Sequence, residues 1–304
     1  MTLMSSRTRL ATLASLSALA LAGLSGCGDE AKDPASADST PTQAADPSDD
    51  ASEPTEPTSS AAAETTTVPV YFVGDTPQGQ RLFREFRKVE ADNPADEALA
   101  LMTAGDALDP DYDTLYPDGG SFSSVDVGDK MITVDMSDDS WTTAPDGMSE
   151  DDARLAAQQL VYTVQGVAQK RLPVSITVDG APADLFGLAG QVTNDPEIDV
   201  RALVNVTTPE EGASVRGTFT ATGVSSSFEA TTPWEIRAGG ADGKVVTKGF
   251  ATAEGWMDKL YPWETEVDVS GLPAGDYTFV AMTDDPSGGE GGGPTVDTKS
   301  ITVK

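Results

Sequence analysis

The side chains that most often carry out chemistry are scarce in this sequence. Its 304 residues contain a single cysteine, Cys27, and no histidine. A Ser-His-Asp or Cys-His site therefore cannot be built, and any metal site must use oxygen ligands. No G-x-S-x-G motif, P-loop or dinucleotide fingerprint is present. Paired carboxylates could still hydrolyse glycosidic bonds, but nothing in so acidic a sequence selects a pair. We therefore expect a protein that is not an enzyme and has no cofactor.

Oxygen ligands for a metal are best represented in the stretch DPDYDTLYPDGG. Asp109, Asp111 and Asp113 have the alternating spacing that begins a calcium-binding loop. The remainder of the pattern fails, because Thr114 stands where an EF-hand needs glycine and Gly120 where it needs glutamate. The three aspartates are weak metal candidates, and a solvated acidic loop is the favoured interpretation. The glycine-rich stretch at 284–294 is a similarly weak cation candidate, more typical of a long hairpin connection.

Aromatic side chains offer a second kind of binding site. Trp256, Tyr261 and Trp263 lie close together in the stretch GWMDKLYPWE. If exposed, they could stack on the sugar rings of a wall glycan such as peptidoglycan. The favoured alternative is that they belong to a hydrophobic core, since large aromatic residues are mostly buried.

Basic residues are concentrated in RLFREFRKVE, residues 81–90, within an acidic chain. They could contact an anionic wall polymer, or they could pair with neighbouring carboxylates. Pairing is the favoured interpretation, because the formal net charge of the chain is −31. The same charge opposes binding to nucleic acid through like-charge repulsion, so no nucleic-acid partner is expected.

The surroundings of Cys27 indicate an attachment site for lipid. Arg7 and Arg9 precede an uncharged, Leu- and Ala-rich run that is too short for a typical membrane-spanning helix. The quartet formed by Leu24, Ser25, Gly26 and Cys27 resembles the bacterial lipobox, which implies a signal peptide over residues 1–26 and acylation of the Cys27 thiol. The alternative is an ordinary secretory signal with an incidental cysteine. Acyl chains on one residue, such as palmitate, would suffice to hold a protein on a membrane.

The stretch that follows Cys27 contains no large apolar residue. From residue 28 to residue 67 the sequence consists of Asp, Glu, Ser, Thr, Pro, Ala and Gly with single Lys and Gln residues. Such a segment cannot bury enough apolar surface to offset the entropy of ordering. We therefore predict a disordered acidic linker over residues 27–67.

Alternating and helical patterns begin at Val68. Strands are predicted at VPVYFV, RLFREFRKVE, SFSSVDVG, KMITVDMS and PVSITVD, with helices beginning at Pro94 and just after the capping box of Ser149 and Asp152. The second helix is expected to bury one face on a sheet. In this order, VPVYFV, LYPDGGSF, ITVDMS, LVYTV and VSITVDG resemble the GerMN domain of sporulation and spore-germination proteins. The resemblance implies an α+β module over residues 68–187 that is not known to be catalytic.

Beyond a predicted linker at residues 188–198, only strand patterns remain. About seven short strands separated by turn signals predict a β-sandwich over residues 199–304. The order of TPEEGASVRGTFTATG, SFEATTPWEI, GFATAEGW and GDYTFVAM resembles the immunoglobulin-like domain found with GerMN in bacterial spore-germination lipoproteins. The predicted fold class is therefore an α+β GerMN-like domain followed by an all-β immunoglobulin-like sandwich.

Together these patterns predict a non-catalytic protein held by lipid on the outer face of a bacterial cytoplasmic membrane. It would bind or scaffold other envelope components, either proteins or a wall polymer, and the resemblance links it to processes of the sporulation or germination type. The alternative is a lipoprotein that recognises a wall glycan or a divalent cation.

The lipid anchor can be tested by one substitution. A Cys27→Ala variant should incorporate no labelled fatty acid and should leave the membrane fraction, because the acylated thiol is lost. Metabolic labelling with an alkyne fatty acid followed by cell fractionation measures both effects. A variant that stayed membrane-bound and labelled would exclude Cys27 as the anchor.

Overall fold

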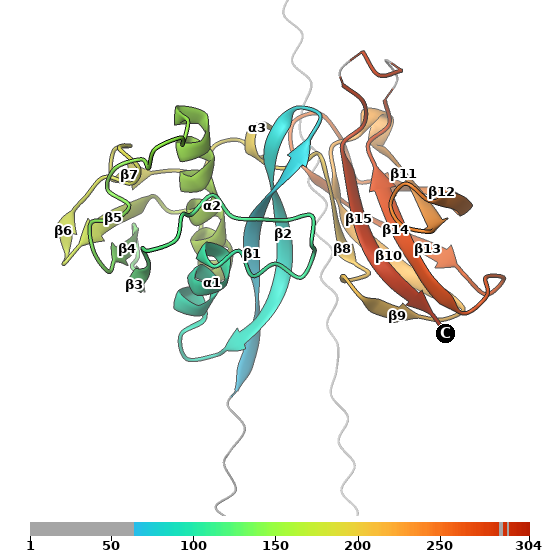
Figure 1. The fold of residues 1–304 in the computed structure, drawn as a ribbon, viewed down its shortest axis with the longest axis horizontal. Coiled ribbons are helices and arrows are strands. Elements are labelled where there is room, and N and C mark those ends of the chain that lie inside the picture. The colour runs from blue at the N-terminus through green and yellow to red at the C-terminus, as the bar shows by residue number, and fades with distance from the viewer. Residues whose placement is uncertain (1–63, 286–287, 291) are drawn as a thin grey trace, which may run out of the picture. The chain divides into compact units, whose positions relative to one another are not determined.

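The computed structural model describes residues 64–285, 288–290 and 292–304. The predicted signal peptide, the lipobox with Cys27, and all but the last residues of the acidic linker lie outside this part of the chain. The described residues form an α+β domain followed by a β-sandwich (Figure 1), which confirms the predicted fold class. None of the helices within these ranges has the length and apolar character needed to cross a bilayer.

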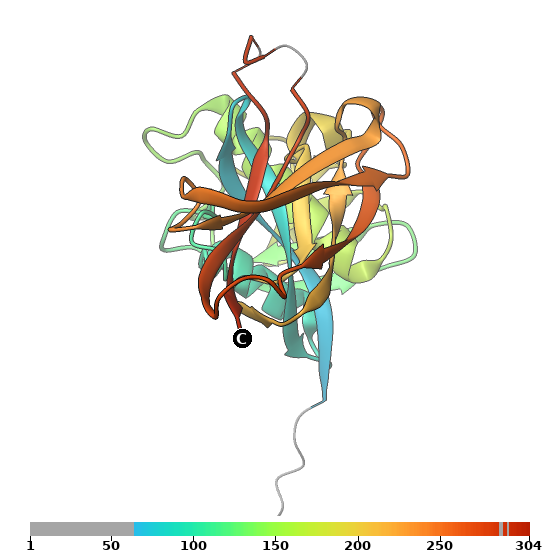
Figure 2. The same ribbon diagram turned by 90° about the vertical axis from the view of Figure 1, so that its right-hand side faces the viewer.

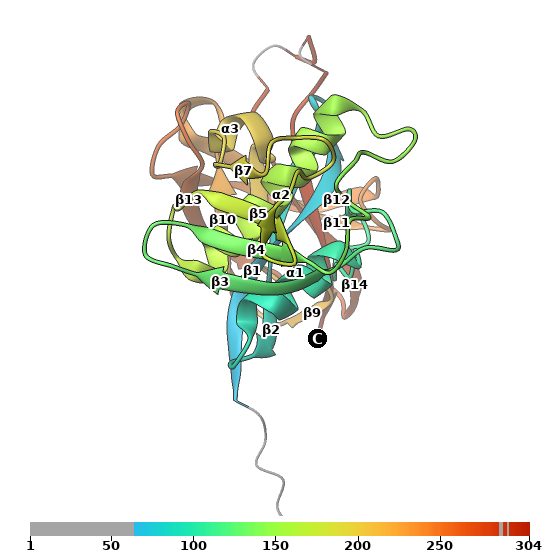
Figure 3. The same ribbon diagram turned by 90° about the vertical axis from the view of Figure 1, so that its left-hand side faces the viewer.

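The α+β domain begins with a long hairpin and then alternates helices with a second sheet. Its elements are β1 (Thr65–Thr76), β2 (Gly79–Glu90), α1 (Pro94–Thr103), β3 (Phe122–Val127), β4 (Ile132–Met136), α2 (Glu150–Ala168), β5 (Val174–Val178), β6 (Ala181–Pro182), β7 (Gln191–Val192) and α3 (Glu197–Val200). Strands β3 and β4 pair as the predicted antiparallel hairpin, while β4 and β5 are parallel and are connected through α2. This sheet has the order β3-β4-β5-β6, with β7 beside β5. Figure 3 shows its strands β3, β4 and β5 in front of the helices.

The predicted linker at residues 188–198 contains ordered structure. Strand β7 lies within it and pairs antiparallel with β5, through Val174 and Val192. Leu188 and Val192 also pack against the core of the α+β domain. The greater part of this stretch therefore completes the first domain, and α3 begins at its end.

Helix α2 begins at the capping box predicted from the sequence. The side chain of Ser149 accepts a hydrogen bond from the Asp152 N–H, and Asp152 accepts one in return from the Ser149 N–H. The prediction of a single buried face is incomplete, because Gln159 and Thr163 are also buried. Their side chains face strand β1, so α2 packs between this strand and the second sheet.

Polar side chains of α2 form hydrogen bonds with backbone groups on the outer edge of β1. The Gln159 amide donates to the carbonyl of Tyr71 at 3.0 Å, and the Tyr71 N–H donates to the Thr163 hydroxyl at 3.2 Å. Strand β1 pairs with β2 on its other side, in register from Thr65 opposite Glu90 to Thr76 opposite Gly79. The edge that would otherwise expose backbone groups is thus covered by a helix.

The outer edge of β2 is covered by the chain that leads into the sandwich. The Ala202 N–H donates to the Leu82 carbonyl at 3.0 Å, and the Arg84 N–H donates to the side-chain oxygen of Asn205 at 2.8 Å. Asn205 is 1% exposed and lies in β8 (Val204–Thr208), the first strand of the second domain. The hairpin therefore links the two domains through its backbone.

The sandwich is built from one continuous sheet that folds back on itself. Its further strands are β9 (Ala213–Val215), β10 (Thr218–Ser225), β11 (Thr231–Ala238), β12 (Lys244–Ala253), β13 (Tyr261–Asp268), β14 (Gly275–Met282) and β15 (Val296–Val303). The order is β8-β10-β13-β12-β11-β14-β15-β9, and β8 also contacts β14 and β15 across the fold. Figure 2 views the molecule from the side of this domain. Phe219 and Phe279 approach each other within the enclosed core, with ring centroids 6.3 Å apart.

Two tryptophans of this core pack directly on glycines. A Cβ added to Gly223 would lie 2.4 Å from the Trp263 ring and 2.4 Å from the Asn205 carbonyl oxygen. A Cβ added to Gly249 would likewise lie 2.4 Å from the Trp234 ring. Glycine within these strands permits a close approach that any side chain would prevent.

A Gly223→Ala substitution should therefore destabilise the fold by about 1–3 kcal/mol, because neither the indole nor the backbone can move away freely. Urea unfolding followed by tryptophan fluorescence measures the change. Gly271→Ala is the matched control, since an added Cβ there meets nothing within 4 Å. Equal unfolding midpoints for the two variants would contradict the packing described.

Candidate functional site

An exposed aromatic pair lies on two loops of the sandwich. Phe228, in the connection from β10 to β11, is 40% exposed, and Trp256, between β12 and β13, is 36% exposed. Their rings meet edge to face, with centroids 5.1 Å apart and planes inclined by 78°. Met257 follows at 67% exposure. We refer to Phe228, Trp256 and Met257 as the loop patch.

The backbone around the loop patch is held in a conformation that disfavours ordinary side chains. Met257 has a φ of 86°, and Glu229 and Ala230 have φ values of 51° and 58°. Non-glycine residues in this left-handed region are uncommon and persist only where the surroundings hold them. The Met257 N–H is fixed by a 2.9 Å hydrogen bond to the hydroxyl of Ser226. The surrounding loops thus hold the Met257 side chain outward.

The three aromatic residues considered from the sequence do not act together. Trp263 is 3% exposed and belongs to the sandwich core, as the core interpretation predicts. Tyr261 packs against that core, and its hydroxyl donates to Asp258 at 2.8 Å. Trp256 alone joins a surface cluster, with Phe228 as a partner that sequence reasoning missed. The pairing was hidden because the two loops are far apart in the chain.

A buried ionic cluster joins the two domains. The Lys299 ammonium in β15 contacts Asp109 of the α+β domain, the Tyr112 hydroxyl at 2.7 Å and Asp297 at 3.0 Å. Lys299 is 4% exposed, Asp109 1% and Asp297 3%. We call Lys299, Asp109, Asp297 and Tyr112 the Lys299 cluster. It places one cation between two carboxylates, out of contact with solvent.

Neighbouring polar groups complete the cluster. The second oxygen of Asp297 accepts hydrogen bonds from the Asn205 amide at 3.0 Å and from the Val206 N–H at 2.5 Å. Asn205 in turn binds the edge of β2, so the network continues into the hairpin. Glu85 accepts the Asp109 N–H at 2.8 Å. Buried charges are tolerated when their remaining donors and acceptors are satisfied in this way.

Burial changes the proton affinities in the Lys299 cluster. It raises the pKa of Asp109 to about 6, although the Lys299 charge acts in the opposite direction. Burial alone would lower the pKa of Lys299, but the charges of Asp297 and Asp109 raise it above its usual value. A perturbed carboxyl can mark a reactive site, yet here each shift is explained by burial and by structural partners. The cluster therefore serves to join the domains.

This arrangement separates the three aspartates considered as metal ligands. Asp109 forms an ion pair with Lys299, and Asp111 accepts a hydrogen bond from the Thr298 hydroxyl at 3.0 Å. Asp113 accepts the Thr114 N–H at 2.7 Å. Their carboxylates have three different sets of partners. The alternating spacing in the sequence thus serves two contacts with β15 and one local turn.

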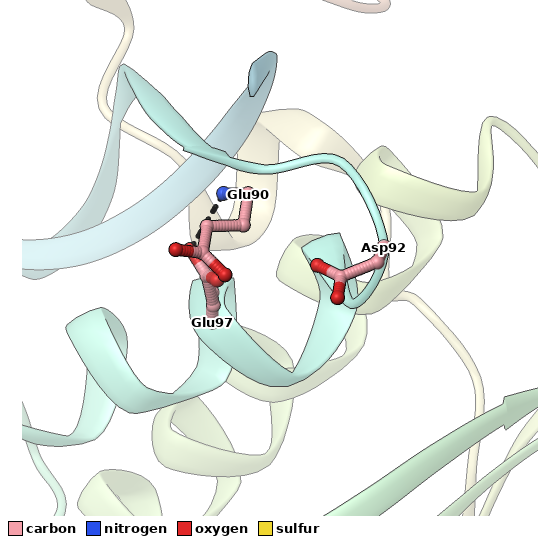
Figure 4. A group of neighbouring side chains, drawn as sticks. All are labelled: Glu90, Asp92 and Glu97. Carbon is pink, nitrogen blue, oxygen red and sulfur yellow. Dashed lines mark hydrogen bonds between the residues drawn. The ribbon is translucent and has the colours of Figure 1, made fainter. Parts of the chain in front are cut away.

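A different acidic group brings its carboxylates together. Oxygens of Glu90, Asp92 and Glu97 lie within 4.8 Å of one another, where β2 ends and α1 begins (Figure 4). Glu90 and Asp92 are exposed, and Glu97 accepts the Glu90 N–H at 2.8 Å. Oxygen ligands at this spacing suit a hard cation. The contact with the Glu90 N–H also gives Glu97 a structural role in the turn.

Part of the basic stretch is neutralised as predicted. Arg87 lies 3.6 Å from Glu85 and 3.2 Å from Asp106. Arg84 behaves differently, because it donates to the Thr207 hydroxyl at 3.3 Å and lies over the Phe86 ring. The stretch therefore contains both a paired arginine and one directed toward aromatic and neutral groups.

The fold and these sites define a two-domain protein in which an α+β domain is coupled to an immunoglobulin-like sandwich. Residues 69–184 match the Germane family, described as sporulation and spore germination. Residues 203–290 match the Gmad2 family, described as the immunoglobulin-like domain of bacterial spore germination. The chain thus carries the Germane and Gmad2 domains, in the order inferred from the sequence.

Two solved structures share features of this chain. A Clostridium perfringens protein, provisionally described as a lipoprotein, is 16% identical with a TM-score of 0.28, covering 44% of this chain and 91% of its own. The tandem GerMN domains of the sporulation protein GerM from Bacillus subtilis are 13% identical with a TM-score of 0.34. That similarity covers 67% of this chain and 62% of the other. No curated protein matches this chain.

Removing the central cation should destabilise the protein. A Lys299→Met variant leaves two buried carboxylates without their partner, which should reduce the free energy of unfolding by about 3–5 kcal/mol at pH 7. Urea unfolding is the measurement, and Lys244→Met, at an exposed position in β12, is the control. A variant as stable as the control would show that the cluster does not support the fold.

The same variant should change the pH dependence of stability. Without Lys299, the folded-state pKa of Asp109 should rise beyond about 6, further above its ordinary value of 3.8. A carboxyl group whose pKa is higher in the folded state favours folding at low pH, where it is protonated. This contribution to the free energy of unfolding is lost as the pH rises through the folded-state pKa. Stability of Lys299→Met should therefore continue to fall above about pH 6, where the contribution of Asp109 to the pH dependence of the wild type ends. Adding Asp109→Asn should remove much of this extra slope.

Proposed function

We propose that this protein is a non-catalytic, lipid-anchored component of the cell envelope that binds or scaffolds other envelope proteins. It would act at the outer face of the cytoplasmic membrane, in a process of the sporulation or germination type. The loop patch is the observation that carries the proposal. Phe, Trp and Met are enriched at protein interfaces, and here they gather on a chain whose formal net charge is −31.

The geometry of the loop patch favours a protein partner. Phe228 stands edge to face against Trp256, and Met257 extends the apolar surface beyond the rings. Methionine adapts its shape to varied apolar partners. The positive φ of Met257 is an energetically unfavourable backbone conformation, and a binding role would explain why it is kept.

Three further observations support this role. Both matched domain families are described by their connection with spore germination. The sequence around Cys27 resembles a lipobox, which would attach the chain to the membrane. The Lys299 cluster couples the two domains, as a scaffold requires.

A second candidate is recognition of a wall glycan or a divalent cation. Trp256 could stack on a sugar ring, and the carboxylates of Glu90, Asp92 and Glu97 could bind a cation. The apolar neighbours of Trp256 offer few hydrogen bonds for sugar hydroxyls, so the protein partner remains the leading proposal.

Photo-crosslinking in cells tests the leading proposal. A photoreactive phenylalanine analogue placed at Trp256 in the full chain should yield a discrete protein adduct on illumination, because the partner covers this side chain. Phe250, which is 65% exposed on β12, is the matched control position and should yield little.

The nature of the adduct separates the two candidates. A defined protein band from position 256 alone, reduced by a Phe228→Ala substitution, supports the binding role. An adduct that disappears after digestion of the wall glycan supports the second candidate instead. Identical crosslinked products from positions 256 and 250 would show that the loop patch is not the binding surface.

A further inference from the structure

The α+β domain contains a basic groove that neither domain family's description explains. Its volume is about 360 Å³, and it is formed by β1, β2 and the C-terminal end of α2. Its charged and aromatic lining consists of Arg84, Lys170, Arg171, Tyr71, Phe86 and Tyr162. We refer to this site as the basic groove. Three cations around one groove are unusual in a chain of formal net charge −31.

Aromatic rings stack on guanidinium groups in and near the groove. Arg84 lies 4.6 Å from the centroid of the Phe86 ring, and Arg171 lies 5.1 Å from that of Tyr162. Arg201, which does not line the groove, lies 5.3 Å from the ring of the lining residue Tyr71 and is only 3% exposed. Stacking of this kind orients a planar guanidinium. Arg171 also donates to the side-chain oxygens of Gln165 and Glu197, both at 3.2 Å.

The positive charge around the groove is only partly neutralised. Glu197 pairs with both Arg171, at 3.2 Å, and Arg201, at 3.4 Å. One carboxylate therefore serves two guanidinium groups. The negative end of α2, near Lys170, contributes only about half a charge. Since Arg84 contacts the neutral hydroxyl of Thr207, an excess of positive charge remains.

Several buried donor atoms of Arg84 and Arg201 also lack acceptors. Among the described residues, the Nε of Arg84 and the Nε and Nη2 of Arg201 are buried without a hydrogen-bond partner. Buried donors of this kind are rare in folded proteins and call for an explanation. Burial also lowers the pKa of Arg84, the direction expected for a cation that lacks sufficient compensation. An anion in the groove would supply the missing negative potential.

We infer that the basic groove binds a phosphate ester. The fork of a guanidinium matches two oxygens of a phosphate group, and Lys170 adds a third charge at the rim. The excess charge favours a phosphate, which as a monoester carries about −1.5 to −2 at neutral pH, over a single carboxylate. The rings of Tyr71 and Phe86 provide apolar surface for the group that bears the phosphate.

The basic groove and the loop patch share no residue. The groove belongs to the α+β domain and the patch to the sandwich. Loss of phosphate binding would therefore leave crosslinking at Trp256 unchanged, and the two proposals can fail separately.

Calorimetric titration of the full chain at low ionic strength tests the inference. Glycerol 3-phosphate should bind, and glycerol should not. Monomeric dihexanoylphosphatidylglycerol tests a lipid headgroup as the source of the phosphate, with the phosphatidylcholine analogue as its control. Binding of glycerol 3-phosphate alone identifies a soluble ester, and binding of both indicates a phosphate that a headgroup can also present. Binding of the lipid alone identifies a headgroup.

Substitutions in the groove locate the binding. Lys170→Gln/Arg171→Gln should weaken binding at least about tenfold, since each charge-assisted hydrogen bond is worth about 1.5–3 kcal/mol. Both side chains are exposed, Arg171 by 54%, so the fold should survive. Arg154→Gln, at an exposed position elsewhere on α2, should bind as the wild type does. Arg84→Gln provides a second groove variant, to be checked for an unchanged melting temperature.

The inference is overturned if no phosphate ester binds, or if binding is the same in the wild type and in the double variant. It is also overturned if sodium glutamate binds as tightly as glycerol 3-phosphate, because the groove would then recognise negative charge in general.

Discussion

The β1–β2 hairpin imposes the constraint on which the rest of this structure depends. A two-stranded ribbon has two open edges and is marginally stable by itself in water. Here Gln159 and Thr163 of α2 bind one edge, while Ala202 and Asn205 bind the other. The hairpin can be buried only because both domains supply hydrogen-bonding groups to it. Its position between helix and sandwich follows from that requirement.

The Lys299 cluster is the second consequence of joining two domains through a hairpin. Asn205 bonds to both the edge of β2 and the carboxylate of Asp297, so the hydrogen bonds of the hairpin and the ion pairs of β15 form one network. Desolvation makes such a cluster favourable only when every charge is matched. This explains why polar residues are nearly as inaccessible here as the surrounding core. The loop patch and the basic groove, which we propose as binding sites, use side chains other than those of the Lys299 cluster.

Local patterns predicted the elements well but the sites incompletely. The capping box of Ser149 and the β3–β4 hairpin depend on neighbouring residues and were found at their predicted places, and the sandwich has eight strands where about seven were predicted. The buried polar face of α2 could not be predicted, because Gln159 is polar in any local pattern and is buried only through its partner on β1. The loop patch and the group at Glu90, Asp92 and Glu97 likewise depend on how separate segments meet. For the group at Glu90, Asp92 and Glu97, the only local signal in the sequence is that acidic residues flank the start of a helix.

The sequence by itself determined the helix and strand patterns of the two domains and the exclusion of histidine and cysteine-pair chemistry, since these depend on composition and local periodicity. The type and order of the two domains followed from their resemblance to known families. It also indicated Cys27 as an attachment point. Tertiary structure decided that Asp109 is a partner of Lys299, that Trp263 is core while Trp256 meets Phe228, and that Arg171 and Arg201 share one carboxylate, that of Glu197. Each of these outcomes depends on burial and on contact between distant segments. The spacing of residues along the chain encodes neither burial nor such contacts.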